Sequence, residues 1–196
     1  MDNSGSRRIV VGVSGASGAA LGLAVLDGLR AAGVESHLVL TRGAELTIEQ
    51  ELSIGVDEFC SHADVVYNNR NIGAAIASGT FKTAGMIVSP CSMKTLAGVA
   101  SGYSENLLLR AADVTMKERR PLVLMVRETP FNSIHVDNMQ RLVRIPGVVL
   151  LPPLLTFYNG AQTVDQMVDE VLRLPEGTAL TLLYRDVAVS YTHLRA

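Results

Sequence analysis

The sequence predicts a doubly wound α/β fold in a single domain, built around a mostly parallel β-sheet. Short apolar runs rich in β-branched residues alternate along the chain with longer segments of helical periodicity, which is typical of consecutive βαβ units. The chain has 196 residues, about the size of one domain. Hydrophobic residues make up 48% of it and charged residues 18%, so a core between sheet and helices can form.

The apolar patterns place five strands and the helices between them. Strands are expected at residues 8–13, 36–41, 84–90, 121–128 and 147–153. Helices are expected at residues 20–33, 45–52, 95–102, 106–119, 133–145 and 163–174. The polar, turn-rich residues 57–70 are predicted to be a loop, and residues 71–79 a short helix or loop.

One functional domain is predicted for residues 1–175, without internal repeats. Residues 176–196 break from the preceding alternation of strands and helices. We interpret them as an atypical tail: an added strand, a disordered end, or sequence not native to the protein.

Composition and charge argue against several classes of protein. The net charge is −2 and no long basic run is present, which disfavours nucleic-acid binding. No apolar run reaches the ~18 residues that a membrane span needs. The polar N-terminus does not resemble a signal peptide, and two cysteines, Cys60 and Cys91, are too few for a disulfide framework. These features predict a cytoplasmic protein.

Glycines cluster where the first expected strand passes into the first helix, in the segment GVSGASGA of residues 12–19. Glycines let backbone N–H groups approach a phosphate, and a helix N-terminus favours the anion. The spacing is not that of a dinucleotide fingerprint, a P-loop or a nucleophile elbow. Two interpretations remain: a mononucleotide phosphate site, or a tight turn in which Ser14 or Ser17 caps the helix.

Polar residues also follow the third and fourth expected strands. Residues 89–95 read SPCSMKT and lie at the sheet edge where open α/β proteins bind ligands. No histidine lies near Cys91 in sequence, so as a nucleophile it would need a base from elsewhere in the fold, and we interpret it as a small buried side chain. Arg127 and Glu128 follow the next strand at the same edge, as ligand contacts or as a structural ion pair. The charged run 110–120 is typical of a solvated helix face.

Five segments occur in a specific order along the chain: GASGA, SPCSMKTLAG, RAADVTMKERRPLVL, RETPF and PPLLTFYN. Together they resemble the UbiX/Pad-type flavin prenyltransferases, a branch of a flavoprotein group that includes flavin-dependent cysteine decarboxylases. The resemblance extends from about Arg8 to Val171. GASGA alone is weakly specific, whereas the ordered series is highly specific.

The resemblance implies a flavodoxin-like Rossmann fold that assembles as a homododecamer with sites at subunit interfaces. It implies FMN, bound without a covalent link and without a metal, and dimethylallyl phosphate as the prenyl donor. The dimethylallyl group is then expected to be joined to N5 and C6 of reduced FMN. The product, prenylated FMN, is expected to serve a UbiD-type decarboxylase.

The resemblance also implies roles for individual residues. Contacts with FMN are implied for Gly15, Ala16, Ser17, Thr41, Ser92, Met93, Lys94, Thr95 and Arg127. Catalytic roles are implied for Glu51 in proton handling, and for Lys117 and Glu128 around the allylic phosphate. Tyr158 is implied to bind the donor.

One position departs from the family pattern. The arginine expected on the last helix, counted from Tyr158, falls on Leu174, and Arg173 is one residue short of it. One residue turns a helix by ~100°, so Arg173 can bind the donor phosphate only if the helix shifts in register. The alternatives are an FMN-binding protein without turnover, or an FMN-dependent decarboxylase of the cysteine-decarboxylase group. The latter group carries a tryptophan-containing segment, whereas this chain has no tryptophan.

Overall fold

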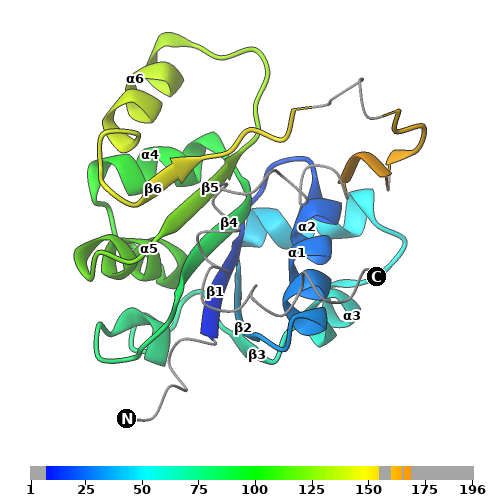
Figure 1. The fold of residues 1–196 in the computed structure, drawn as a ribbon, viewed down its shortest axis with the longest axis horizontal. Coiled ribbons are helices and arrows are strands. Elements are labelled where there is room, and N and C mark those ends of the chain that lie inside the picture. Colours follow the sequence, from blue (N-terminus) through cyan, green and yellow to red (C-terminus); the bar gives the residue numbers. More distant parts are fainter. Residues whose placement is uncertain (1–7, 155–159, 165, 169–196) are drawn as a thin grey trace, which may run out of the picture.

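A computed structural model describes residues 8–154, 160–164 and 166–168 (Figure 1). In these residues one six-stranded sheet has the order β3-β2-β1-β4-β5-β6, and every neighbouring pair is parallel. The strands are β1 (Arg8–Val13), β2 (Glu35–Leu40), β3 (Val65–Tyr67), β4 (Gly85–Cys91), β5 (Leu122–Val126) and β6 (Val148–Leu150). This confirms the predicted doubly wound α/β class.

Helices cover both faces of the sheet (Figure 1). They are α1 (Ala19–Ala31), α2 (Arg42–Glu51), α3 (Val56–Ser61), the 3-10 helix η2 (Ala75–Ala77), α4 (Met93–Ser101), α5 (Leu107–Lys117) and α6 (Ser133–Leu142). Helices α1 to α3 pack on one face and α4 to α6 on the other. Each connection between strands therefore crosses one face, as parallel pairing requires.

Two hydrophobic cores lie between the sheet and its helices. Successive side chains of a strand point to opposite faces. Ile9 and Val11 of β1 accordingly join the core beneath α1, whereas Val10 joins the core beneath α4 and α5. Because both faces are covered, the central strands are buried along almost their whole length and read as continuous apolar runs.

The prediction of a loop over residues 57–70 was wrong, because the region contains most of α3 and all of β3. Strand β3 has only three residues and pairs with β2 alone, from His37↔Val65 to Val39↔Tyr67. Asp64 anchors its start by accepting hydrogen bonds from the amide (2.7 Å) and hydroxyl (2.9 Å) of Ser36. Without this added edge strand, the remaining five have the order of a flavodoxin-like sheet.

The strand order reverses between β1 and β4, which makes their carboxyl ends the switch point where such sheets bind ligands. The ladder between the two strands runs from Ile9↔Gly85 to Gly12↔Val88. Beyond it, the pairing of β4 with β5 shifts in register between Val88 and Cys91. The chain next to the switch point is therefore not held by regular ladder hydrogen bonds.

The predicted last helix is described only in part, at positions 164 and 166–168, which are helical. Tyr158, Arg173 and the predicted tail 176–196 lie outside the described residues. Among the described residues, no helix combines the length and the apolar character needed to cross a membrane.

Candidate active site

Most of the predicted site residues meet at the carboxyl edge of the sheet. The loop Ser14–Gly18 follows β1, the N-terminus of α2 follows β2, the segment Ser92–Thr95 follows β4, and Arg127 follows β5. Hydrogen bonds join the ends of β1 and β4 and the ends of β4 and β5. The structure thus brings together residues that are more than 100 positions apart in the sequence.

Ser14 links the ends of β1 and β4. Its side chain is buried, and its hydroxyl donates a hydrogen bond to the carbonyl of Pro90 (3.0 Å). The same hydroxyl accepts a hydrogen bond from the amide of Ser92 (2.8 Å). Ser14 therefore does not cap α1, which the sequence had left open as one interpretation.

Ser92 begins helix α4. Its hydroxyl accepts from the amide of Thr95 (3.3 Å) and donates to the Thr95 hydroxyl (3.2 Å), which satisfies one of the free N–H groups of the first turn. Met93 and Lys94 occupy that first turn, and Lys94 is exposed. The predicted flavin-contacting segment is therefore the N-terminal turn of a helix at the switch point.

The loop after β1 and the start of α2 touch backbone to backbone. A Cβ atom added to Gly15 would lie 2.8 Å from the Cα of Gly43, and one added to Gly43 would lie 3.0 Å from the Cα of Gly15. Thr41 caps α2 by accepting from the amide of Ala44 (3.1 Å), and its own amide donates to Val13 (3.0 Å). The pair of glycines brings the two loops into direct contact.

The N-terminus of α1 binds a carboxylate of the protein itself. Gly18 precedes the helix with a left-handed backbone, and it has no side-chain cap. Instead, the amides of Gly18 (2.8 Å) and Ala19 (2.9 Å) both donate to Oε2 of Glu51, at the end of α2. The interpretation that this helix N-terminus holds a phosphate, or is capped by a serine, therefore does not describe this structure.

The surroundings of Glu51 keep its carboxyl group ionised. Partial burial raises its pKa, but the amides of Ala19 and Gly18, the hydroxyl of Ser17 and the positive charge of Arg127 together lower the pKa below the usual value. Glu51 therefore carries a negative charge at neutral pH.

Arg127 and Glu128 continue the same edge. The amide of Arg127 donates to the carbonyl of Cys91 (3.1 Å), which joins the ends of β5 and β4. The Arg127 side chain is exposed, and Glu128 accepts a hydrogen bond from the amide of Thr129 (2.9 Å). In the part of the chain that the structure describes, the two side chains form no ion pair with each other. Both are therefore available to a ligand.

Cys91 is not a nucleophile in this site. Its side chain is fully buried, and burial raises the pKa of the thiol to about 12. The thiol therefore stays protonated and out of reach, because a reactive cysteine needs an accessible thiolate. This confirms the interpretation of Cys91 as a small core residue.

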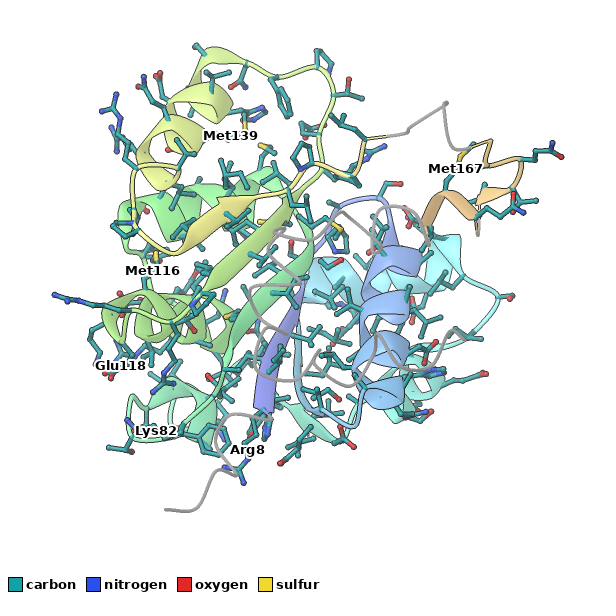
Figure 2. All side chains as sticks on the ribbon, viewed as in Figure 1. Arg8, Lys82, Met116, Glu118, Met139 and Met167 are labelled. Carbon is teal, nitrogen blue, oxygen red and sulfur yellow. The ribbon has the colours of Figure 1, made fainter. Side chains whose placement is uncertain are left out.

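Lys117 does not reach this edge within one chain. It ends α5 just before β5 begins, whereas Arg127 directly follows β5. The five residues of β5 separate the two edges by roughly 17 Å at ~3.3 Å per residue. Lys117 is exposed and pairs with Glu118, which Figure 2 labels on the same side as Lys82 and Arg8, the first residue of β1. A role for Lys117 at this edge therefore requires a second chain.

Two residues of the site were not selected by sequence reasoning. Gly43 directly follows Thr41-Arg42, and its contact with Gly15 depends on the distance between two loops that the sequence does not reveal. Ser14 was considered only as a cap, although it stands next to a buried strand end. A serine at the end of a central strand, opposite a proline that cannot donate a ladder hydrogen bond, is the signal that points to it.

The arrangement agrees with comparisons to known proteins. The family model of the flavoproteins matches residues 1–174. The chain belongs to the flavoprotein family. Within it, the chain is 55% identical over 162 residues to the flavin prenyltransferase UbiX of Neisseria meningitidis serogroup B, covering 83% of this chain and 85% of the relative.

Two solved flavoprotein structures are similar over most of their length. A complex of AnUbiX with FMN and dimethylallyl pyrophosphate has a TM-score of 0.85 and 45% identity, and covers 90% of this chain and 92% of that chain. A dodecameric, FMN-dependent UbiX-like decarboxylase from Escherichia coli O157:H7 has a TM-score of 0.81 and 43% identity, with 94% of each chain covered. Both confirm the flavodoxin-like α/β fold and the predicted family.

Proposed function

We propose that this protein is a flavin prenyltransferase that transfers a dimethylallyl group from dimethylallyl phosphate to N5 and C6 of reduced FMN. One observation carries the proposal. The chain is 55% identical to a flavin prenyltransferase. Three segments that carry predicted site residues meet at its switch point: 14–18, 92–95 and 127–128. AnUbiX, which is 45% identical, has been solved with both FMN and a dimethylallyl donor.

The residues of this edge fit a flavin. The N-terminal turns of α2 and α4 offer amides and the hydroxyls of Thr41, Ser92 and Thr95, while Arg127 offers a guanidinium group for an anion. We propose FMN contacts for the full predicted set: Gly15, Ala16, Ser17, Thr41, Ser92, Met93, Lys94, Thr95 and Arg127.

When bound, reduced FMN would supply N5, which would replace the phosphate on the first carbon of the dimethylallyl group, and C6, which would bond to its tertiary carbon. The second bond balances when the alkene takes up one proton and C6 gives one up, and a nearby carboxylate can carry such a proton. Glu51 is ionised and lies beside the β1 loop, so we assign it this role, with Glu128 close to the leaving phosphate. Holding donor and acceptor together contributes much of the remaining rate enhancement.

Lys117 is proposed to act across a subunit interface. It lies exposed at the opposite edge of its own chain, so it can stabilise the charge of a departing phosphate only in a neighbouring subunit. We propose a homododecamer, as in the UbiX-like relative from Escherichia coli O157:H7. Tyr158 and Arg173 are proposed to complete the phosphate site.

The product is proposed to leave for a UbiD-type decarboxylase, and the enzyme to be cytoplasmic. Both cysteines of the chain are free thiols, as a reducing compartment allows. No part of the site needs a metal in this scheme, because cationic side chains and helix amides stabilise the phosphate.

A second candidate function is FMN binding without turnover. It is favoured by the sequence of the last helix, where Leu174 stands at the position expected for an arginine. Cypemycin decarboxylase, at 21% identity and a TM-score of 0.62, shares the fold with this chain, and that likeness gives no support to a decarboxylase function.

The two functions differ in donor turnover. The protein is incubated without air with reduced FMN and either dimethylallyl phosphate or dimethylallyl pyrophosphate, and the released phosphate or pyrophosphate is quantified. We expect release from the monophosphate that depends on both protein and reduced FMN. Tight FMN binding with no release from either donor would establish the second candidate.

A further inference from the structure

The buried hydroxyl of Ser14 replaces the β-sheet ladder at the switch point. Regular pairing between β1 and β4 ends at Gly12↔Val88. Two residues later the ladder cannot be continued from β4, because Pro90 has no N–H group. Both the amide (3.2 Å) and the hydroxyl (3.0 Å) of Ser14 donate to the carbonyl of Pro90 instead.

Ser14 also extends this connection to the next helix. Its hydroxyl accepts from the amide of Ser92 at 2.8 Å, and Ser92 in turn caps α4 and bonds to Thr95. The Ser14 side chain is 1% exposed, so water does not compete for these bonds. The hydroxyl donates its single proton to the Pro90 carbonyl and accepts the Ser92 amide proton on a lone pair. Both bonds can form together only when the three residues keep this relative position.

The two segments joined in this way are the two halves of the flavin site proposed above. On the β1 side, Ala16 donates its amide to the carbonyl of Ser14 at 2.8 Å, which ties the loop Gly15–Ser17 to Ser14. On the β4 side, the Ser92 amide is the first group of the segment Ser92–Thr95. The Ser14 hydroxyl thus sets the separation of the two segments and is itself buried.

We propose that Ser14 is a positioning residue, whose buried hydroxyl holds the β1 loop and the N-terminus of α4 at the spacing that FMN requires. The inference rests on the proposed function. Without the hydroxyl, the Ser92 amide loses its partner and α4 loses its fixed register against the β1 loop. Small displacements of this kind weaken binding and catalysis disproportionately.

The test compares three Ser14 variants with a matched control. Ser14→Ala removes the hydroxyl, Ser14→Thr keeps it, and Ser14→Cys keeps the size with a weaker hydrogen-bonding group. The control is Ser89→Ala, because the Ser89 hydroxyl is equally buried in β4 but donates to Met125 Sδ (3.2 Å) instead of to the site. For each protein, the Kd of FMN is measured by quenching of flavin fluorescence, and the melting temperature without FMN is recorded.

We expect Ser14→Ala to weaken FMN binding roughly tenfold, and Ser14→Thr to restore most of the loss. Ser89→Ala is expected to lower the melting temperature while leaving the Kd of FMN near that of the wild type. Wild-type affinity in Ser14→Ala, or an equal loss of affinity in Ser89→Ala, would overturn the inference. If Ser14→Ala does not fold, Ser14→Cys decides in the same way, with an intermediate Kd expected. A wild-type protein that fails to bind FMN would instead overturn the proposed function itself.

Discussion

Gly15 and Gly43 are in contact through their backbones, so neither loop of the site can carry a side chain at this point. A Cβ at Gly15 would lie 2.8 Å from Gly43 Cα and 2.9 Å from its carbonyl carbon. We expect Gly15→Ala to push α2 away from the β1 loop, with a loss of about 1–3 kcal/mol in the free energy of unfolding. Urea denaturation measures it.

The matched control for this substitution is Gly73→Ala. A Cβ there would meet only the side chain of Asn71, at 3.6 Å, which is ordinary van der Waals contact. We expect its free energy of unfolding to stay near that of the wild type. Equal effects of the two substitutions would show that the contact between Gly15 and Gly43 is not tight.

Glu51 is expected to stabilise the protein through the N-terminus of α1. Because the pKa of Glu51 is lowered in the folded protein, its contribution is present above the unfolded value of about 4.3 and is lost as the pH falls through the folded pKa. Glu51→Gln is expected to cost about 0.3–1 kcal/mol at pH 7. Urea denaturation at pH 7 and pH 3 checks it, with Glu49→Gln on the same helix as control. A Glu51→Gln protein as stable as Glu49→Gln would contradict the assignment.

His37 is expected to make folding sensitive to mild acid. Its ring is buried between Tyr67 (2.9 Å) and Glu35 (3.1 Å), and burial lowers its pKa more than the charge of Glu35 raises it. The unfolded chain takes up a proton at about pH 6.5, whereas the folded protein takes it up only at lower pH. The free energy of unfolding should therefore fall as the pH decreases below about 6.5.

Replacement of His37 isolates this effect. We expect His37→Gln to remove most of the change in stability between pH 7.5 and pH 5.5. The measurement is urea denaturation at both pH values. If the His37→Gln variant retains the full acid sensitivity, the effect belongs to other groups.

The position of Lys117 predicts complementation between subunits. Homo-oligomers of Lys117→Ala and of Arg127→Ala should both be inactive. When the two variants are co-expressed, a site that takes Lys117 from one subunit and Arg127 from another is intact in about a quarter of cases under random mixing. Recovery to about that fraction of wild-type prenyl transfer supports a shared site. No recovery would place both residues in one subunit's site, or exclude Lys117 from it.

The sequence predicted the fold class and most of the site segments because both are local properties. Buried parallel strands are continuous apolar runs, and the polar residues that follow them must lie at the carboxyl edge. Strand β3 was missed because three residues show no period and its neighbours are polar. The binding of the Glu51 carboxylate at the N-terminus of α1 was missed because the hydrogen bonds from Gly18 and Ala19 to Glu51 span more than 30 residues. Nothing in GASGA distinguishes a protein carboxylate from a phosphate.

The placement of Lys117 shows a different limit. The motif RAADVTMKERRPLVL identifies Lys117 as a family residue, but it does not reveal at which edge of the sheet Lys117 lies. Only the direction of α5 relative to β5 reveals that, and it changes the interpretation from a group within the chain to one supplied by a neighbouring chain.

The altered position on the last helix leads to a further expectation. If Leu174 stands where the donor phosphate needs an arginine, Leu174→Arg should lower the KM for dimethylallyl phosphate and leave the Kd of FMN unchanged. Leu172→Arg serves as control, because two residues turn the helix predicted from the sequence by about 200°. An unchanged KM in Leu174→Arg would mean that Arg173 already fills the role.

The mass of the flavin released after anaerobic turnover tests the central claim most directly. The protein is loaded with FMN, reduced, supplied with dimethylallyl phosphate and denatured, and the flavin is analysed by mass spectrometry. A gain of one C5H8 unit, absent without protein, is the predicted result. FMN that remains bound through the reaction and is recovered unmodified would contradict the assignment of this chain as a flavin prenyltransferase.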